Sequence, residues 1–306
     1  MLCCLIFYKA AVIFDLLVNS THLNKNITTP YMEKKKKSVL LVMILLSFFS
    51  IKSVAQKLSN IQLNSLRLAA NLKIDGKATE WDNKFQAHNN ATELFYTIAN
   101  DDNNLYLLIR ADKPRIIQKI ISVGVTFVID VSNKRKIQDP QNITITYPQI
   151  NVNNGMLIIS KAGAKAEIIT SLPETLRDTS STLTITDSLI NVANMLFTSA
   201  AKTIKVKRGL RPDSSISIYN EERIRVGASF DKGTYTYELL IPLKFLKLTS
   251  NDIQEFNYNV RLKSRLDVPK QGMRVRYIYP NGVMTDVDQD LDSTTDFWGK
   301  YILAKK

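Results

Sequence analysis

A run of alternating aspartates near the C-terminus has the residue type and spacing of a metal site. Asp286, Asp288, Asp290 and Asp292 alternate with other residues, and Asp296 follows closely. On a strand, alternate side chains share one face, where neighbouring carboxylates need a cation or water between them. An EF-hand loop would need glycine at its sixth position and glutamate at its twelfth, which are leucine and phenylalanine in this run. The run therefore predicts a calcium site of another kind or a solvated acidic rim, and the second alternative is favoured.

The chain has too few histidine and cysteine residues for several common kinds of catalytic and metal site. His88 is the only histidine after residue 55, and Cys3 and Cys4 lie in the N-terminal segment. A His/Cys zinc site, a cysteine nucleophile and a haem with two axial side chains are therefore not expected. A serine hydrolase triad is not expected either, because His88 lies in a polar run without a nucleophile elbow. A carboxylate pair for glycoside hydrolysis, drawn for example from Glu80 and Glu238, stays open because the sequence does not give their separation.

A secretory signal peptide is predicted at residues 32–55. The basic start Met32–Lys37 is followed by the apolar stretch Ser38–Ser50 and the small-residue triplet Ser53–Ala55. These three parts in this order are typical of a cleaved signal, and the apolar stretch is shorter than the ~20 residues of a membrane-spanning helix. An uncleaved anchor is the alternative. Residues 1–31 would precede the signal, so we interpret them as an over-extended gene start.

Cleavage before Gln56 would leave residues 56–306 as an exported protein, periplasmic or secreted, without a stable membrane anchor. The full chain has 41 basic and 28 acidic residues, and 56–306 keeps 34 and 26, so the net charge falls from +13 to +8. The basic residues are spread along predicted strands, as in Arg261 and Lys263, and form no block. A solvated sheet face explains this pattern, so no nucleic-acid partner is predicted.

Alternation of apolar and polar residues with period two dominates the chain after residue 56. Such runs, rich in β-branched and aromatic residues, predict strands. The clearest runs are 105–109, 125–129, 143–145, 235–241, 258–262 and 275–279. Glycine accepts a positive φ, so three dipeptides predict turns between strands: Asp75-Gly76, Asn154-Gly155 and Asn281-Gly282.

Two segments, 114–122 and 187–201, have apolar residues at helical spacing, and 163–186 is predicted to be a loop. Many short strands with few helices predict an all-β protein, an antiparallel β-sandwich with one or two short helices. Without cysteine there is no disulfide, so the size of 56–306 must supply the core of one domain.

Four segments, in order along the chain, resemble family 9 carbohydrate-binding modules and their relatives in secreted bacterial proteins. They are Leu72–Trp81 (LKIDGKATEW), Tyr96–Leu108 (YTIANDDNNLYLL), Ile218–Glu221 with Tyr237–Leu243 (IYNE, YELLIPL), and Asp296–Ala304 (DFWGKYILA). The resemblance covers nearly all of 56–306. It implies a jelly-roll sandwich of the kind that these modules share with DOMON domains.

The resemblance also implies a function, the non-catalytic binding of a carbohydrate or another cell-envelope ligand. Sugar-binding members clasp the ligand between aromatic rings, but this chain has only Trp81 and Trp298 and no assignable tryptophan pair. Trp81 is expected to plug the sandwich, so the predicted ligand site is Trp298, Tyr279 and Asp296. A structural or protein-interaction module on the same fold is the alternative, and a glycoside hydrolase is less expected.

Overall fold

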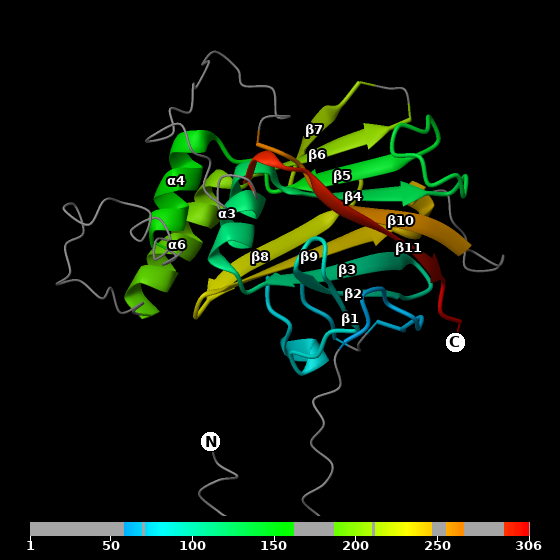
Figure 1. Ribbon diagram of the computed structural model, residues 1–306, viewed down its shortest axis with the longest axis horizontal. Helices are drawn as coiled ribbons and strands as arrows, with labels where there is room; N and C mark the ends of the chain where they lie inside the picture. Colours follow the sequence, from blue (N-terminus) through cyan, green and yellow to red (C-terminus); the bar gives the residue numbers. More distant parts are fainter. Residues whose placement is uncertain are drawn as a thin grey trace, which may run out of the picture. The chain divides into compact units, whose positions relative to one another are not determined.

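Two antiparallel sheets carry most of the chain that the computed structural model describes, which is residues 58–68, 71–161, 187–209, 212–246, 255–265 and 291–305 (Figure 1). The five-stranded sheet has the order β1 (Ala87–Asn89), β2 (Leu94–Asn100), β3 (Asn104–Ala111), β9 (Thr234–Pro242), β8 (Arg225–Asp231). The six-stranded sheet has the order β11 (Thr295–Ile302), β10 (Glu255–Leu262), β4 (Val125–Asp130), β5 (Ile143–Tyr147), β6 (Thr203–Arg208), β7 (Ser214–Ser217). The predicted all-β, antiparallel architecture is confirmed.

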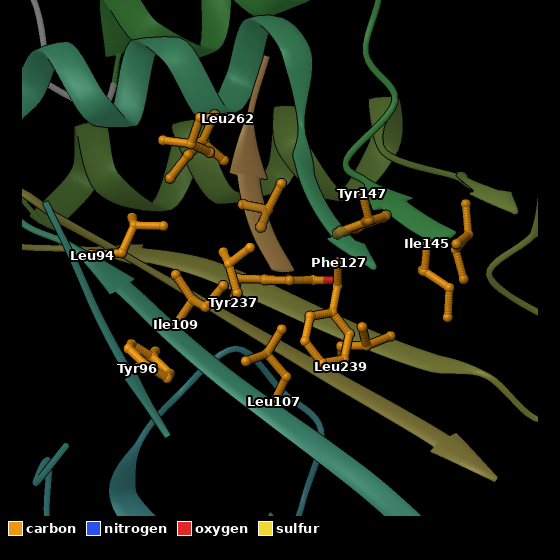
Figure 2. Packing of buried hydrophobic residues seen from close by; sticks show 14 of the residues in the cluster. Leu94, Tyr96, Leu107, Ile109, Phe127, Ile145, Tyr147, Tyr237, Leu239 and Leu262 are labelled. Carbon is orange, nitrogen blue, oxygen red and sulfur yellow. The ribbon is translucent and has the colours of Figure 1, made fainter. Parts of the chain in front are cut away.

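The core lies between the two sheets, as in a sandwich. Leu107 and Ile109 of β3 and Phe127 of β4 point into it, and Figure 2 shows how they pack with their neighbours. Tyr96 of β2 and Tyr258 of β10 meet across the interface, with their hydroxyl oxygens 3.0 Å apart. Alternate residues of the central strands enter this core, and in β4 the residues between them are buried as well.

Three helices gather at one end of the sheets: α3 (Pro114–Val123), α4 (Val152–Lys161) and α6 (Asp187–Ala200) (Figure 1). Helix α3 contacts both β3 and β10, so its isoleucines close the end of the sandwich. The predictions at 114–122 and 187–201 are confirmed. The turn predicted at Asn154-Gly155 is wrong, because both residues lie inside α4, whose Ile158 and Ile159 are buried in the core.

A second apolar layer covers the outer face of the five-stranded sheet. It is formed by residues 58–68 and 71–85, which include the 3-10 turn η1 (Thr79–Trp81), packed on Tyr106 and Leu108 of β3. Trp81 stacks on Tyr106 with ring centroids 5.7 Å apart. The expectation that Trp81 plugs the sandwich is therefore wrong: its ring lies outside the sheet, because the chain before β1 crosses that face.

The last strand is tied to the first described residues. The Tyr301 hydroxyl of β11 donates to the carbonyl of Leu66 at 3.1 Å and lies 3.0 Å from Asn100 Oδ1. Asn100 Oδ1 also accepts a hydrogen bond from the backbone of Ala304 at 2.7 Å. These contacts join segments more than 200 residues apart in the sequence.

All described residues belong to one compact unit that begins at Leu58. No helix among them is long and apolar enough to span a membrane. A second 3-10 turn, η3 (Leu243–Leu246), follows β9 directly. The predicted signal at 32–55, loop at 163–186, strand at 275–279 and turn at Asn281-Gly282 lie outside the described residues.

Candidate functional site

A polar groove of about 530 Å³ lies on the outer face of the six-stranded sheet. Its floor is made by the outward side chains of β4, β5, β6 and β10, and one wall is the loop between β4 and β5. In an antiparallel sheet with one covered face, the residues that alternate with the core residues are free to face a ligand. The floor of the groove is therefore formed by the outward-facing residues of these strands, which alternate with the residues that face the core.

The floor consists of two rows that cross the sheet from strand to strand. Directly paired residues in an antiparallel sheet point to the same face, so the strand register defines each row. The first row is Asp296, Arg261, Thr126, Thr146, Lys205, and the second is Trp298, Asn259, Val128, Thr144, Lys207. Both rows end in a lysine on β6 and include a threonine on β5. In the first row the hydroxyl oxygens of Thr126 and Thr146 are 3.0 Å apart.

Four cationic side chains line the groove, namely Lys205, Lys207, Arg261 and Lys263, against two carboxylates. Asp213 is ion-paired with Lys205 at 2.6 Å, and Asp139 with Lys134 at 3.2 Å. The hydrogen bond from Lys205, with Lys207 and Lys263 at longer range, lowers the pKa of the Asp213 carboxyl. Both groove carboxylates are thus engaged, and the field in the groove is positive.

Three buried polar atoms on this face have no hydrogen-bond partner among the described residues: Arg261 Nε, Asn142 Oδ1 and Asn259 Oδ1. Each asparagine already donates from Nδ2 to two acceptors. Asn142 donates to the carbonyls of Lys136 and Ile137, and Asn259 to Asp296 Oδ2 and the carbonyl of Phe297. Asn142 and Arg261 line the groove, and Asn259 lies in the second row next to Val128 of its floor. Buried polar atoms without partners are rare in folded proteins, so three of them on one face indicate where another molecule can bond.

The wall of the groove is held in place from both ends. At its start, the Asp130 carboxylate accepts hydrogen bonds from the backbone of Ser132 at 2.9 Å and of Arg135 at 2.7 Å. At its end, Gly209 packs against Pro140 with a φ of +59°, and a Cβ at this glycine would lie 2.1 Å from the Pro140 carbonyl oxygen. The loop is therefore preorganised, which lowers the entropic cost of binding.

Two of the predicted ligand residues lie on this face. Asp296 and Trp298 begin the two rows, at the edge strand β11, although neither lines the groove itself. The neighbouring Phe297 points the other way, into the core, so the half-exposed Trp298 ring is on the groove side of the sheet. The third predicted residue, Tyr279, lies outside the described residues.

The predicted calcium ligands are not gathered in the described part of the chain. Asp292 is bound by the guanidinium of Arg265, whose Nη2 lies 3.1 Å from Asp292 Oδ2. Asp286, Asp288 and Asp290 lie outside the described residues. Within the described ranges, no group of three or more His, Cys, Asp or Glu side chains could hold a metal ion. The calcium site remains a prediction.

Glu238, considered above for glycoside hydrolysis, lies on the opposite sheet and is fully buried. Its carboxylate accepts hydrogen bonds from the Tyr106 hydroxyl at 2.7 Å and from the backbone of Asp75 at 2.8 Å and Gly76 at 2.6 Å. Burial raises the pKa of Glu238 to about 7, against the lowering effect of these three donors. Neither Glu238 nor Glu80 lines the groove, and Glu238 anchors the turn that the sequence predicted at Asp75-Gly76.

A second hollow, of about 1000 Å³, lies beside the hairpin tip Asp101–Asn104. There the Asp101 carboxylate is occupied within its own turn, accepting hydrogen bonds from the backbone of Asn103 and Asn104. None of the unpartnered buried atoms in the described residues lines this hollow. The groove is thus the better candidate site.

The cations of the groove were not predicted as a site from the sequence. Lys205 and Lys207 alternate on β6, and Arg261 on β10 is followed by Lys263 just beyond the end of that strand, which is a detectable signal. What the sequence does not show is that β6 and β10 lie on either side of β4 and β5 in one sheet.

No protein-family model matches the chain, and no curated protein matches it. The resemblance to family 9 carbohydrate-binding modules therefore remains a prediction.

Proposed function

We propose that this is an exported, non-catalytic binding protein whose groove on the six-stranded sheet takes a carbohydrate of the cell envelope or its surroundings. The observation that carries the proposal is the pair of cross-strand rows with unpartnered polar atoms beside them. Sugars present many hydroxyls, each able to donate and accept. The groove offers threonine hydroxyls, amide oxygens and cationic donors in a fixed arrangement.

Trp298 extends this surface toward the sheet edge. It starts the row that continues through Asn259 to Val128 in the groove floor. Two strand spacings separate β11 from β4, which is roughly 10 Å. An oligosaccharide that fills the groove could therefore place a further sugar ring on the tryptophan, whose face suits sugar C–H groups.

The proposed role is binding without catalysis because of the state of the groove carboxylates. Glycoside hydrolysis uses two carboxyl groups, one of which must give up or accept a proton. In the groove, Asp139 and Asp213 are both ion-paired with lysines, and hydrogen bonding lowers the pKa of Asp213. Neither is poised as a proton donor near neutral pH.

A groove-filling variant tests this function. We expect the full chain to bind at least one glycan on a glycan array, and Thr144→Tyr, which projects a ring into the groove, to abolish that binding. Thr203→Tyr is the matched control, because Thr203 is exposed on β6 outside the groove lining. Absence of glycan binding by the unmodified protein, or equal binding by Thr144→Tyr, would refute the proposal.

Export is proposed on the sequence pattern of residues 32–55. N-terminal sequencing of the protein secreted by an expressing bacterium should begin at Gln56. A start upstream of Met32 in the exported form would contradict both the signal peptide and the interpretation of residues 1–31.

A further inference from the structure

We infer that the groove selects glycans whose sugar units carry negative charge, an inference that rests on the proposed function and names its ligand class. Lys207 and Arg261 form no ion pair within the described residues, although both line the groove. The Nε of Arg261 is buried and has no protein partner there. A buried guanidinium nitrogen of this kind is satisfied best by an oxyanion, because charge-assisted hydrogen bonds are shorter and stronger than neutral ones.

The acceptors beside these cations identify the rest of the ligand. Asn142 Oδ1 and Asn259 Oδ1 need donors, since the amide nitrogens of both residues are already bonded. A sulfate dianion brings only acceptors and a hydrogen phosphate dianion brings a single donor, so neither could satisfy both amide oxygens. A sugar with a carboxylate, sulfate or phosphate group brings oxyanion and hydroxyl donors together, and so matches both kinds of unpartnered atom.

The residues that line the groove do not suit a nucleic acid. Single strands are held by aromatic side chains on which successive bases stack, together with a basic groove. The described lining of this groove contains threonines, lysines and an arginine, and no aromatic side chain. A nucleic acid would supply oxyanions from its phosphates, but its bases would find no aromatic ring to stack on among the described lining residues.

The spacing of the cations indicates an oligosaccharide. Lys207 on β6 and Arg261 on β10 are separated by β5 and β4. Their backbones therefore stand three strand spacings apart, roughly 14 Å. A ligand with charge on successive sugar units contacts both ends of the groove, whereas a charged monosaccharide contacts one, so the oligomer should bind more tightly.

Calorimetric titration of the full chain with three oligosaccharides of equal length tests the inference: oligogalacturonate, its methyl ester, and a sulfated galactan fragment. We expect at least one of the two anionic oligomers to bind about tenfold more tightly than the ester. Preference for the uronate or for the sulfate then assigns the anionic group. The dissociation constant should rise with salt, because salt screens the groove cations.

Two variants test whether the cations of the groove bind the anionic oligosaccharide. Lys207→Ala and Arg261→Gln should each weaken binding of the anionic oligomer by about tenfold. Lys300→Ala removes the same charge from the same sheet face outside the groove, where Lys300 is paired with Glu255, and should leave binding unchanged. Thermal unfolding of each variant confirms that it is folded.

The outcomes separate the two proposals. If the methyl ester binds as tightly as both anionic oligomers and the two groove variants bind normally, charge selection is refuted while glycan binding survives. If none of the oligosaccharides binds and the glycan array shows no ligand, the proposed function fails, and the inference fails with it.

Discussion

The two sheets are both antiparallel, but their outer faces differ: one is covered by another part of the chain, and the other carries the groove. The five-stranded sheet is covered by the chain that precedes it, and the carboxylate of Glu238 beneath this cover accepts three hydrogen bonds. Within the described residues, no segment covers the groove of the six-stranded sheet, and three buried polar atoms on that face have no partner. One outer face of the sandwich is thus stabilised by the protein's own chain, and the other is the face that we propose binds a ligand.

The same difference is visible in which residues are buried along a strand of each sheet. In β9, every residue from Tyr235 to Pro242 is buried, because both of its faces are packed. In β11, buried residues alternate with exposed or half-exposed ones from Asp296 onward. An alternating strand with polar outward residues therefore indicates an open face, and a continuous buried run indicates a covered one.

The covered face should be most sensitive at Gly76. This residue has a φ of +82°, and an added Cβ would lie 2.4 Å from the Ala228 carbonyl carbon. We expect Gly76→Ala to lower the free energy of unfolding by on the order of 4 kcal/mol, measured by urea denaturation. Gly233→Ala is the control: its φ is +81° but nothing lies within 4 Å of the new Cβ, so about 1 kcal/mol should be lost. Equal losses in the two variants would show that the turn does not depend on this close approach.

Glu238 should make stability depend on pH. Its pKa rises from 4.5 unfolded to about 7 folded, so folding takes up a proton between these values. The contribution of Glu238 is therefore most favourable below pH 4.5, and stability on the order of 2–3 kcal/mol is lost as pH rises through 7.

The variant Glu238→Gln isolates this effect, because the glutamine oxygen can accept from Asp75 and Gly76 while its amide donates to Tyr106. Urea denaturation at pH 5 and pH 8 should show that the variant loses less stability with rising pH than the unmodified protein. A variant that is less stable at pH 8 by a few kcal/mol would mean that the buried carboxylate is held ionised by its donors.

Tyr106→Phe should have a smaller effect on the same cluster. It removes one hydrogen bond to Glu238, and we expect a loss of about 1–2 kcal/mol in urea denaturation. Because that bond lowers the pKa of Glu238, the loss should be larger at pH 8 than at pH 5. Tyr237→Phe is the matched control, since the buried Tyr237 hydroxyl has no partner among the described residues. If the control loses as much, the contact with Glu238 is not what stabilises this face.

Substitutions on the groove face of the six-stranded sheet should change the stability of the protein least. Lys207→Ala removes an exposed groove cation without disturbing the core, so the free energy of unfolding should change by less than about 0.5 kcal/mol in urea denaturation. A loss above about 1 kcal/mol would mean that this face contributes to folding as the covered one does.

Many of the local features of the two sheets could be predicted from the sequence. The strands at 105–109, 125–129, 143–145, 235–241 and 258–262 follow from alternation, and the outward direction of Glu238 follows from its place between Tyr237 and Leu239. The positive φ at Gly76 follows from the Asp-Gly dipeptide. These features are local, and local chemistry determines them.

The rest depends on contacts between distant segments. The Asn154-Gly155 dipeptide is helical because Ile158 and Ile159 bury one side of α4, an effect that overrides the turn preference. Trp81 lies outside the sheet because the chain before β1 crosses the outer face. The groove joins four strands whose order in the sheet no local pattern gives.

The ties between Tyr301, Leu66 and Asn100 have a consequence for how this protein acquires its structure. Residues at the two ends of the described chain must meet before the edge of the six-stranded sheet is complete. Contacts at such separation in sequence slow folding, since a long loop must close before they form. A chain still lacking its last strand cannot complete the six-stranded sheet, so the sandwich is expected to stay incompletely folded until the C-terminal residues are available.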